Sequence, residues 1–201
     1  MPRAAANGEI PNWDRMFELA SGQGGYVTNK QAAEAGYSLP LLQFYLQKGR
    51  LERVQRGILR LVHYPPGDHE DLVPLWLWSE REGVFSHETA LMLHDLSDAL
   101  PSKRHMTVPA SWSKRRVRVP RGLVLHVADL PRSGKTWLGP VPLTTPLRTI
   151  ADCATAHVAD DLIRQAATQG VRRNLFTRAQ VSAVLQKARR ERDAAAKLRK
   201  P

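Results

Sequence analysis

The chain has 201 residues, of which 42% are hydrophobic and 24% are charged. These values fit a globular protein with room for one large domain or two small ones. No apolar run approaches the roughly 18 residues that span a bilayer, the N-terminal sequence lacks the apolar core of a signal peptide, and a single cysteine, Cys153, excludes an internal disulfide. We therefore expect a cytoplasmic protein with no membrane partner.

The charge of the chain predicts a polyanionic partner. Thirty lysines and arginines oppose nineteen acids, which gives a net charge of +11, and such an excess most often indicates nucleic-acid binding. Residues 66–100 hold eight acids and one arginine, whereas residues 101–135 hold nine bases and one acid, and residues 172–200 hold ten bases and two acids. Separate acidic and basic zones favour more than one partner.

The first part of the chain begins with signals for two helices. Apolar residues recur at helical spacing from Trp13, and the sequence "SGQGG" ends that helix. A very short strand, "YV", follows. Thr28 is then a favourable N-cap, and Gln31 completes a capping-box pattern. The second helix covers about residues 29–35 and ends at Gly36, where a residue without Cβ suits the left-handed turn.

A third helix and a hairpin complete this region. Ser38 caps the helix, Pro40 fits its first turn, and Lys48 ends it. The second and third helices, joined by a three-residue turn, match a helix-turn-helix. "RLERV" and "GILRL" alternate apolar residues about a turn at Arg56-Gly57, which predicts a β-hairpin with a basic tip. The ordered set indicates a winged helix.

The third helix is the expected recognition helix. Leu42, Tyr45 and Leu46 would face the core, which leaves its glutamines and lysine pointing outward. Glutamine can pair with adenine edges, lysine with guanine or phosphate, and arginines on the wing can reach phosphates or the minor groove. The residues that we expect at DNA are Thr28, Lys30, Ser38, Pro40, Gln43, Phe44, Gln47, Lys48, Arg53, Arg56 and Arg60. The alternative is a protein-interaction module, because seven bases and four acids give this segment a net charge of only +3.

The remaining sequence predicts a second domain of mixed secondary structure. "HYPPGDHED" is typical of a linker, and a helical apolar pattern from Leu72 brings Trp76 and Trp78 into a second core. "HMTVP" and "GLVLHVADL" are typical of strands, "VPLTTPLRTIADCAT" predicts a turn that leads into a helix, and two more helices follow, the last capped by Thr177. We expect an α/β (α+β) fold with a winged-helix domain at residues 10–64, a mixed domain at residues 70–188 and a solvated basic tail at residues 189–201.

Two short motifs resemble ligand sites but have simpler explanations. "SGKT" at residues 133–136 is similar to the end of a phosphate-binding P-loop, yet Asp129 stands where that loop requires glycine. "HED" at residues 69–71 has the residue types of metal ligands, yet it lies in an acidic linker beside two prolines. A solvated turn is the better interpretation of the second motif.

The stretch "VFSHETALMLHDL" looks most like an active site, because it sets Ser86, His87 and Glu88 side by side, with His94 seven residues after His87. One zinc ion on a helix needs histidines four residues apart, and a spacing of seven separates them by roughly 10 Å along the axis. A helix start explains the stretch better, since Ser86 is a favoured N-cap and Glu88 complements the helix dipole. A metal-dependent nuclease or hydrolase that uses these four residues is the alternative from another class.

Three segments occur in a specific order and spacing: "GYVTNKQAAEAGYS" leading to "GRLERVQRGILRL", "FSHETALMLHDLSDALP" followed by "HMTVP", and "PLTTPLRTIADC". Over about residues 13–187 the chain therefore resembles the AbiEi-type antitoxins of bacterial abortive-infection (type IV toxin–antitoxin) systems. Leu59 departs from the tyrosine that the wing of such proteins often carries, which we expect to alter packing rather than role. The resemblance implies a winged helix that binds inverted repeats in its own promoter as a repressor. It also implies a C-terminal domain that counteracts a nucleotidyltransferase-like toxin, and no enzymatic activity.

The leading hypothesis is a DNA-binding antitoxin and autorepressor that needs no cofactor and no metal. Its partners would be double-stranded promoter DNA, on which it could dimerise, and the cognate toxin. Additional phosphate or toxin contacts are expected from the basic residues Lys114, Arg115, Arg116, Arg118, Arg121, Arg172 and Arg173. A free-standing transcriptional regulator without a toxin is the remaining alternative.

Overall fold

The computed structural model describes residues 10–198, and the side chains of residues 10–194. It has the mixed α+β fold that the sequence predicted, with one sheet of three strands and one of five. The chain divides into two compact units. The first runs to Arg81 and includes Gly139–Val141, and the second comprises Glu82–Leu138 and the chain from Pro142 onward.

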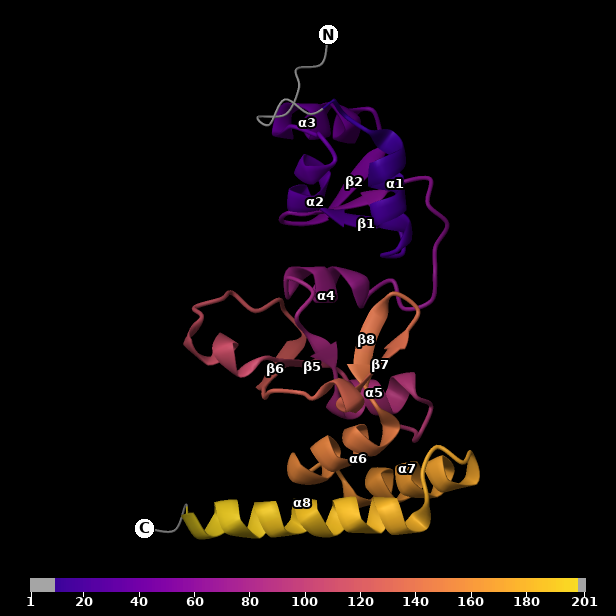
Figure 1. Cartoon of the computed structure of the whole chain (residues 1–201), viewed down its shortest axis with the longest axis vertical. Coiled ribbons are helices and arrows are strands. Elements are labelled where there is room, and N and C mark those ends of the chain that lie inside the picture. The colour runs from indigo at the N-terminus through magenta and orange to yellow at the C-terminus, as the bar shows by residue number, and fades with distance from the viewer. Residues whose placement is uncertain (1–9, 199–201) are drawn as a thin grey trace. The chain divides into compact units, whose positions relative to one another are not determined.

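The first unit contains the predicted winged helix (Figure 1). Its helices are α1 (Trp13–Ser21), α2 (Asn29–Glu34) and α3 (Leu39–Gln47), and its strands are β1 (Tyr26–Thr28), β2 (Leu51–Gln55) and β3 (Ile58–Leu61). The strands form an antiparallel sheet in the order β1-β3-β2. Strands β2 and β3 are the predicted hairpin, with Arg56 and Gly57 in its turn. The predicted helix-turn-helix and wing are thus both confirmed.

Side-chain caps fix where α2 and α3 begin. The Thr28 hydroxyl accepts the Gln31 N–H at 3.1 Å, and the Gln31 carboxamide oxygen accepts the Thr28 N–H at 2.9 Å, so the predicted capping box is present. Ser38 accepts the Leu41 N–H at 3.4 Å, with Pro40 in the first turn of α3. These caps satisfy donors that a helix start would otherwise leave unpaired.

The core of the first unit lies between its three helices and its sheet. Its buried residues are Met16, Ala20, Val27, Ala32, Ala35, Tyr37, Leu41, Leu42, Leu51, Leu59 and Leu61. Tyr45 and Leu46 are partly buried and pack against this core, so α3 turns the predicted face inward. Leu59 is 2% exposed, which places it in the packing of β3.

A pair of buried amides connects α2 to the end of α1. The Gln31 side chain donates to the Gln23 side-chain oxygen at 2.9 Å, and the Gln23 amide donates to the Tyr26 carbonyl at 3.0 Å. Gln31 also completes the capping box, so one side chain serves both the helix start and the contact with Gln23. Buried amides that are paired in this way specify one arrangement of the helix-turn-helix.

The structure corrects the expected place of helix α4 (Val73–Trp78). Trp76 and Trp78 were predicted in the second core, whereas α4 belongs to the first unit and contacts β1 and β3. The Gln55 side chain donates to the Pro74 carbonyl at 3.1 Å. The acidic linker is also attached, because Glu70 accepts from the Arg60 guanidinium of β3 at 3.2 Å. Apolar periodicity identified a buried helix but not the core to which it belongs.

Gly36 makes the turn between α2 and α3 at a φ of 87°, and a Cβ there would lie 2.7 Å from the Ile10 carbonyl oxygen. We expect Gly36→Ala to lower the free energy of unfolding by about 2–5 kcal/mol. A left-handed conformation costs an L-residue roughly 1–2 kcal/mol, and overpacking adds about 1–3 kcal/mol. Urea denaturation of the purified variant measures the loss.

Gly49 provides the matched control. Its φ is 67°, and a Cβ there would meet no described atom within 4 Å. Gly49→Ala should therefore lose only the backbone contribution, about 1–2 kcal/mol. Equal losses in the two variants would show that the approach to Ile10 does not destabilise Gly36→Ala.

The second unit is built around the five-stranded sheet in the order β6-β5-β4-β8-β7 (Figure 1). Its strands are β4 (Val84–Phe85), β5 (Arg104–Val108), β6 (Leu123–Val127), β7 (Lys135–Leu138) and β8 (Val141–Thr144). β4 pairs antiparallel with β5 and parallel with β8, and β5 pairs parallel with β6. The predicted strands at "HMTVP" and "GLVLHVADL" are confirmed. The start of "VPLTTPLRTIADCAT" is strand β8 rather than the expected turn.

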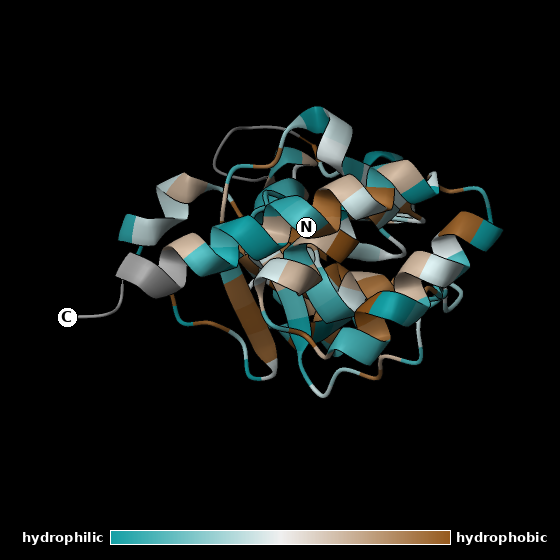
Figure 2. Cartoon of the chain, turned by 90° about the horizontal axis from the view of Figure 1, so that it is seen from below, coloured by the Kyte–Doolittle hydropathy of each residue, from teal (hydrophilic) through white to brown (hydrophobic). Residues whose placement is uncertain are grey.

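Helices cover this sheet and form the second core. They are α5 (His87–Leu93), α6 (Pro146–Thr155), α7 (Asp160–Arg172) and α8 (Arg178–Leu198), with 3-10 turns η1 (Ala110–Lys114) and η2 (Arg132–Gly134). The buried residues of this core include Leu91, Leu96, Ile150, Cys153, Ile163, Ala166, Phe176, Val181 and Ala188. Hydrophilic residues recur along α8 between its hydrophobic ones (Figure 2). The predicted last helix thus continues to Leu198, with Arg189 and Arg190 exposed; residues 199–201 of the expected tail lie outside the described residues.

Candidate functional site

The exposed face of α3 carries the side chains that were predicted to read DNA. Gln43, Phe44, Gln47 and Lys48 are all exposed, and the Phe44 side chain is 51% exposed. The Lys48 ammonium lies 5.6 Å from the centroid of the Phe44 ring. This face therefore combines two amides, one aromatic ring and one cation on a helix whose opposite face is buried, as base readout in a major groove requires.

The other predicted contacts divide into two groups. Lys30, Pro40, Arg53 and Arg56 are exposed, with Arg56 in the wing turn. Thr28 and Ser38, by contrast, use their hydroxyls to cap α2 and α3.

Arg60 corrects the sequence prediction. Its side chain is only 13% exposed, lies 3.2 Å from Glu70 and 3.4 Å from Glu52, and covers the Tyr26 ring at 5.9 Å. Two carboxylates thus hold the Arg60 guanidinium within the unit, whereas the other predicted basic contacts are exposed.

The additional basic residues are also placed differently from one another. Lys114, Arg115, Arg116, Arg118 and Arg121 are exposed at and after η1. Arg115 lies 4.6 Å from the Trp112 ring centroid and 3.8 Å from Glu82.

Arg172 and Arg173 lie at the end of α7. Arg172 is exposed. Arg173 donates to the carbonyls of His94 and Asp95 at 2.7 and 3.0 Å, where α5 ends. Arg173 therefore binds carbonyl groups that the end of α5 would leave unpaired.

A capped helix-turn-helix, an exposed third helix and a two-stranded wing define a winged helix-turn-helix unit. Residues 14–62 match the family model described as "Transcriptional regulator, AbiEi antitoxin". The fold has partial similarity to the crystal structure of the Rv2827c protein from Mycobacterium tuberculosis, with 17% sequence identity, 92% of this chain and 84% of that chain covered, and a TM-score of 0.43. A search of curated proteins gives no match. No described helix is both long and apolar enough to span a membrane.

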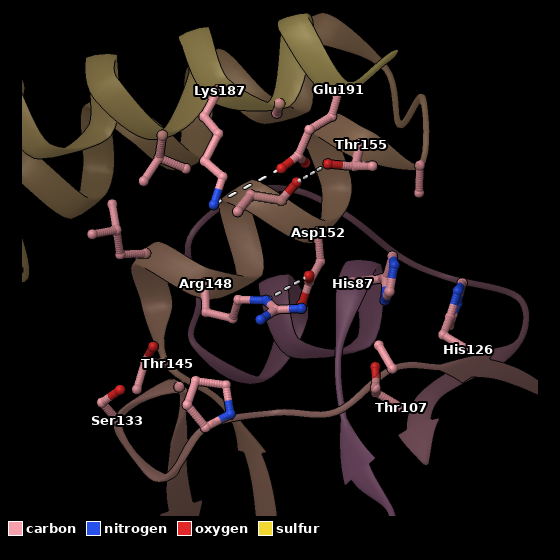
Figure 3. Close-up of a pocket in the computed structure, with 18 residues that line it drawn as sticks. His87, Thr107, His126, Ser133, Thr145, Arg148, Asp152, Thr155, Lys187 and Glu191 are labelled. Carbon is pink, nitrogen blue, oxygen red and sulfur yellow. Dashed lines mark hydrogen bonds and ion pairs between the residues drawn. The ribbon is translucent and has the colours of Figure 1, made fainter. Parts of the chain in front are cut away.

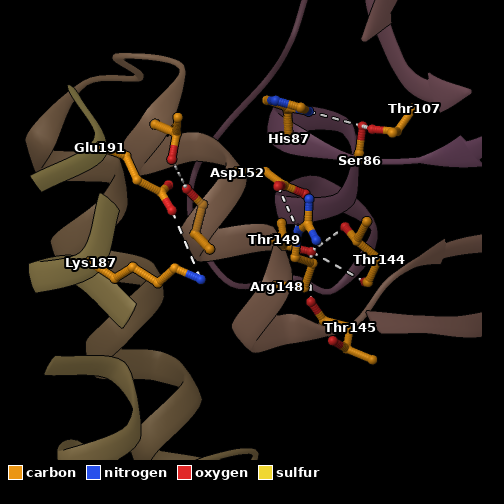
Figure 4. A network of polar contacts seen from close by, with 12 residues as sticks. Ser86, His87, Thr107, Thr144, Thr145, Arg148, Thr149, Asp152, Lys187 and Glu191 are labelled. Atoms are coloured by element: carbon orange, nitrogen blue, oxygen red, sulfur yellow. Dashed lines mark hydrogen bonds and ion pairs between the residues drawn. The ribbon is translucent and has the colours of Figure 1, made fainter. Parts of the chain in front are cut away.

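The stretch "VFSHETALMLHDL" forms β4 and the start of α5, and Ser86 occupies the N-cap position. The expected side-chain cap is wrong, because the Ser86 hydroxyl makes no hydrogen bond to the backbone of α5. It accepts from the Thr107 hydroxyl at 2.8 Å and lies 2.9 Å from His87 Nδ1 (Figure 4). Ser86 is fully buried, so its hydroxyl orients His87 and is not presented to a substrate.

His94 lies apart from this cluster of hydrogen bonds. Its Nε2 is 2.7 Å from the Thr144 carbonyl oxygen, so it holds the end of α5 to β8. Among the described residues, no three His, Cys, Asp or Glu side chains are placed to hold one metal ion. His87 and His94, seven residues apart, therefore make two separate contacts, with Ser86 and with the Thr144 carbonyl.

The structure brings His105 and His126 to His87, which the sequence did not predict. The His87 and His126 rings stack with centroids 3.6 Å apart, and His105 Nδ1 lies 3.0 Å from His126 Nε2. Glu88 lies 3.6 Å from His105 Nε2. His105 and His126 lie on the same face of the sheet as diagonal neighbours, because β5 and β6 pair in parallel register with His105 opposite Val124 and Thr107 opposite His126. Both strands were predicted, and an expectation that they pair in parallel would have identified this cluster.

Burial keeps these imidazoles neutral. It lowers the pKa of His87 to about 3 and the pKa of His126 to about 4, and the neighbouring histidines act in the same direction. Burial also lowers the pKa of His105, which the Glu88 carboxylate opposes. His87 has a φ of 53°, a left-handed conformation that is unusual for a residue with a Cβ. The backbone at position 87 therefore adopts an unfavourable conformation that holds the His87 imidazole in this place.

A pocket of about 670 Å³ lies beside this cluster, within the second unit (Figure 3). His87, Thr107 and His126 contribute from the sheet side, Ser133 and Gly134 from η2, Arg148 and Asp152 from α6, and Lys187 and Glu191 from α8. Ser133 and Gly134, the first two residues of "SGKT", thus line the pocket, but the segment leads into strand β7, whereas a P-loop leads into a helix.

Two ion pairs lie along the pocket. Arg148 Nε donates to Asp152 Oδ1 at 2.7 Å, and Lys187 lies 3.8 Å from Glu191 (Figure 4). The Asp152 side chain is 9% exposed, and burial raises its pKa while Arg148 opposes the rise. Asp152 Oδ2 is buried and has no hydrogen-bond partner among the described residues.

Proposed function

We propose that this chain is a sequence-specific DNA-binding transcriptional regulator of the antitoxin class, which represses its own promoter and counteracts a nucleotidyltransferase-like toxin. The exposed face of α3, with Gln43, Phe44, Gln47 and Lys48, is the observation that supports DNA recognition most directly. The match of residues 14–62 to a family of transcriptional regulators and antitoxins agrees with it.

The second unit contributes a different kind of contact in this proposal. The exposed bases from Lys114 to Arg121, of which Arg115 also lies 3.8 Å from Glu82, would add phosphate contacts or bind the toxin. The role is binding rather than catalysis, since Ser86 is fully buried and His94 is engaged with a main-chain carbonyl.

Removing one groove-facing amide should weaken specific binding. We expect Gln47→Ala to reduce affinity for the chain's own upstream DNA by about 5- to 150-fold, corresponding to about 1–3 kcal/mol for a good base contact. An electrophoretic mobility shift measures this. Gln186→Ala, which removes an exposed glutamine from α8, is the matched control and should bind like the parent.

Removing the cation at the wing tip should act through phosphate contacts. Arg56→Ala is expected to weaken binding to all sequences and to lower the slope of log affinity against log salt by about 1. If Gln47→Ala and Arg56→Ala both leave affinity and its salt dependence unchanged, the assignment of this face to DNA is wrong. Growth on coexpression with a nucleotidyltransferase-like toxin tests the second activity independently.

A further inference from the structure

The pocket of the second unit contains hydrogen-bonding groups that its own residues leave unused. Asp152 Oδ2 is one, because it is buried and unpaired among the described residues. A buried carboxylate oxygen without a donor is unfavourable and rare. A ligand with an N–H group would supply that donor if the Asp152 carboxylate turns toward the pocket, because Oδ2 is buried beneath the pocket surface.

The imidazoles beside the pocket provide a donor and an acceptor. Ser86 accepts from Thr107 and can donate its own hydroxyl proton to His87 Nδ1. Neutral His87 then carries its own proton on Nε2, for which no described residue supplies an acceptor. By the same reasoning, neutral His105 carries its proton on Nε2, which points toward Glu88. His105 Nδ1 then accepts from His126 Nε2–H, and His126 Nδ1 remains as an acceptor.

The charges at the pocket largely compensate one another. Arg148 is paired with Asp152, and Lys187 with Glu191, so these two cations and two carboxylates sum to zero. An ion pair that is satisfied internally attracts a neutral polar ligand better than it attracts a highly charged one. Leu147, Ala151 and Val184 supply apolar wall that can cover the faces of a ring.

We propose that this pocket binds a nucleoside, with the base as the recognised part. A nucleobase is planar and neutral, it has donors and acceptors on one edge, and its faces suit apolar and imidazole walls. The volume of about 670 Å³ lies within the usual range for small-molecule sites. The base would donate to Asp152 Oδ2 and exchange hydrogen bonds with His87 and His126. This site is independent of the DNA-binding proposal, because every residue that lines it belongs to the second unit.

Calorimetric titration of the full chain with adenosine, guanosine, cytidine and uridine tests the proposal. At least one nucleoside should bind with a dissociation constant on the order of 0.1 mM, as expected for a ligand of this size. Asp152→Asn should weaken binding about tenfold, since it replaces a charged acceptor by a neutral amide. A parallel titration with trinucleotides distinguishes a free nucleoside from the end of a nucleic-acid strand.

Two further variants separate binding from folding. Thr155→Trp places a large side chain at an exposed position of the pocket rim and leaves the buried groups unchanged, so it should abolish binding without lowering the melting temperature. Asp161→Asn, at an exposed carboxylate of α7 outside this pocket, should bind like the parent. No binding of any nucleoside or trinucleotide at 5 mM, about fifty times the expected constant, would overturn the proposal. Binding that is unchanged in both Asp152→Asn and Thr155→Trp would overturn it as well.

Discussion

Phe176→Ala is expected to lower the free energy of unfolding by about 3–5 kcal/mol, the usual loss when a buried phenylalanine is truncated. Phe176 is 7% exposed and belongs to the core that joins α6, α7 and α8. Its ring lies directly over Gly170 of α7, where a Cβ would overlap with three ring atoms. The absence of a side chain at position 170 is what admits the ring, so α7 and α8 depend on this contact.

Leu175→Ala is the matched control for this prediction. Leu175 precedes Phe176 but is 42% exposed, so its truncation should change stability by less than about 1 kcal/mol. Urea denaturation monitored by far-ultraviolet circular dichroism measures both variants. If the two losses are equal, the ring of Phe176 does not hold α8 in place.

Acidification from pH 7 to pH 5 is expected to destabilise the chain by roughly 3 kcal/mol through its buried histidines. The pKa of His87 falls to about 3 and that of His126 to about 4 on folding, from an ordinary value of 6.5. Below pH 6.5 the unfolded chain therefore binds protons that the folded chain does not, and stability falls as pH falls. Each unit of pH costs about 1.4 kcal/mol per histidine, so His87 contributes about 2 kcal/mol and the less buried His126 contributes less.

His87→Asn isolates the larger contribution. Asparagine tolerates the left-handed backbone at position 87 and does not titrate. The loss of stability between pH 7 and pH 5 should therefore be about 2 kcal/mol smaller in this variant than in the parent. His63→Asn, at an exposed histidine, should keep the parental pH dependence. A parental pH dependence in His87→Asn would show that His87 is not kept neutral by folding.

The winged helix was predictable from sequence because its signals are local. The capping box of Thr28 and Gln31, the glycine at position 36 and the alternation in "RLERV" and "GILRL" each depend on neighbours a few residues apart. The same kind of reasoning placed Arg60 near the wing and missed its acidic partners, since Glu70 is ten residues away across a linker.

The pocket could not be predicted because its residues meet only through the sheet and the last helix. His87, His126 and Asp152 are 39 and 26 residues apart in sequence order. Their approach depends on the parallel pairing of β5 with β6 and on the packing of α5 against α6. The residues of "SHETAL" were correctly expected to begin a helix, but the Ser86 hydroxyl serves His87 because Thr107 on β5 donates to it.

The amide pair of Gln23 and Gln31 restricts how the sequence can diverge. Replacing one glutamine by an apolar residue would leave the other amide buried with fewer partners, which costs about 1–3 kcal/mol, whereas changing both together can be nearly neutral. Position 31 is restricted further, because its carboxamide also closes the capping box with Thr28. Among related winged helices, we therefore expect positions 23 and 31 to covary, with glutamine or glutamate retained at 31 wherever a threonine or serine precedes it by three residues.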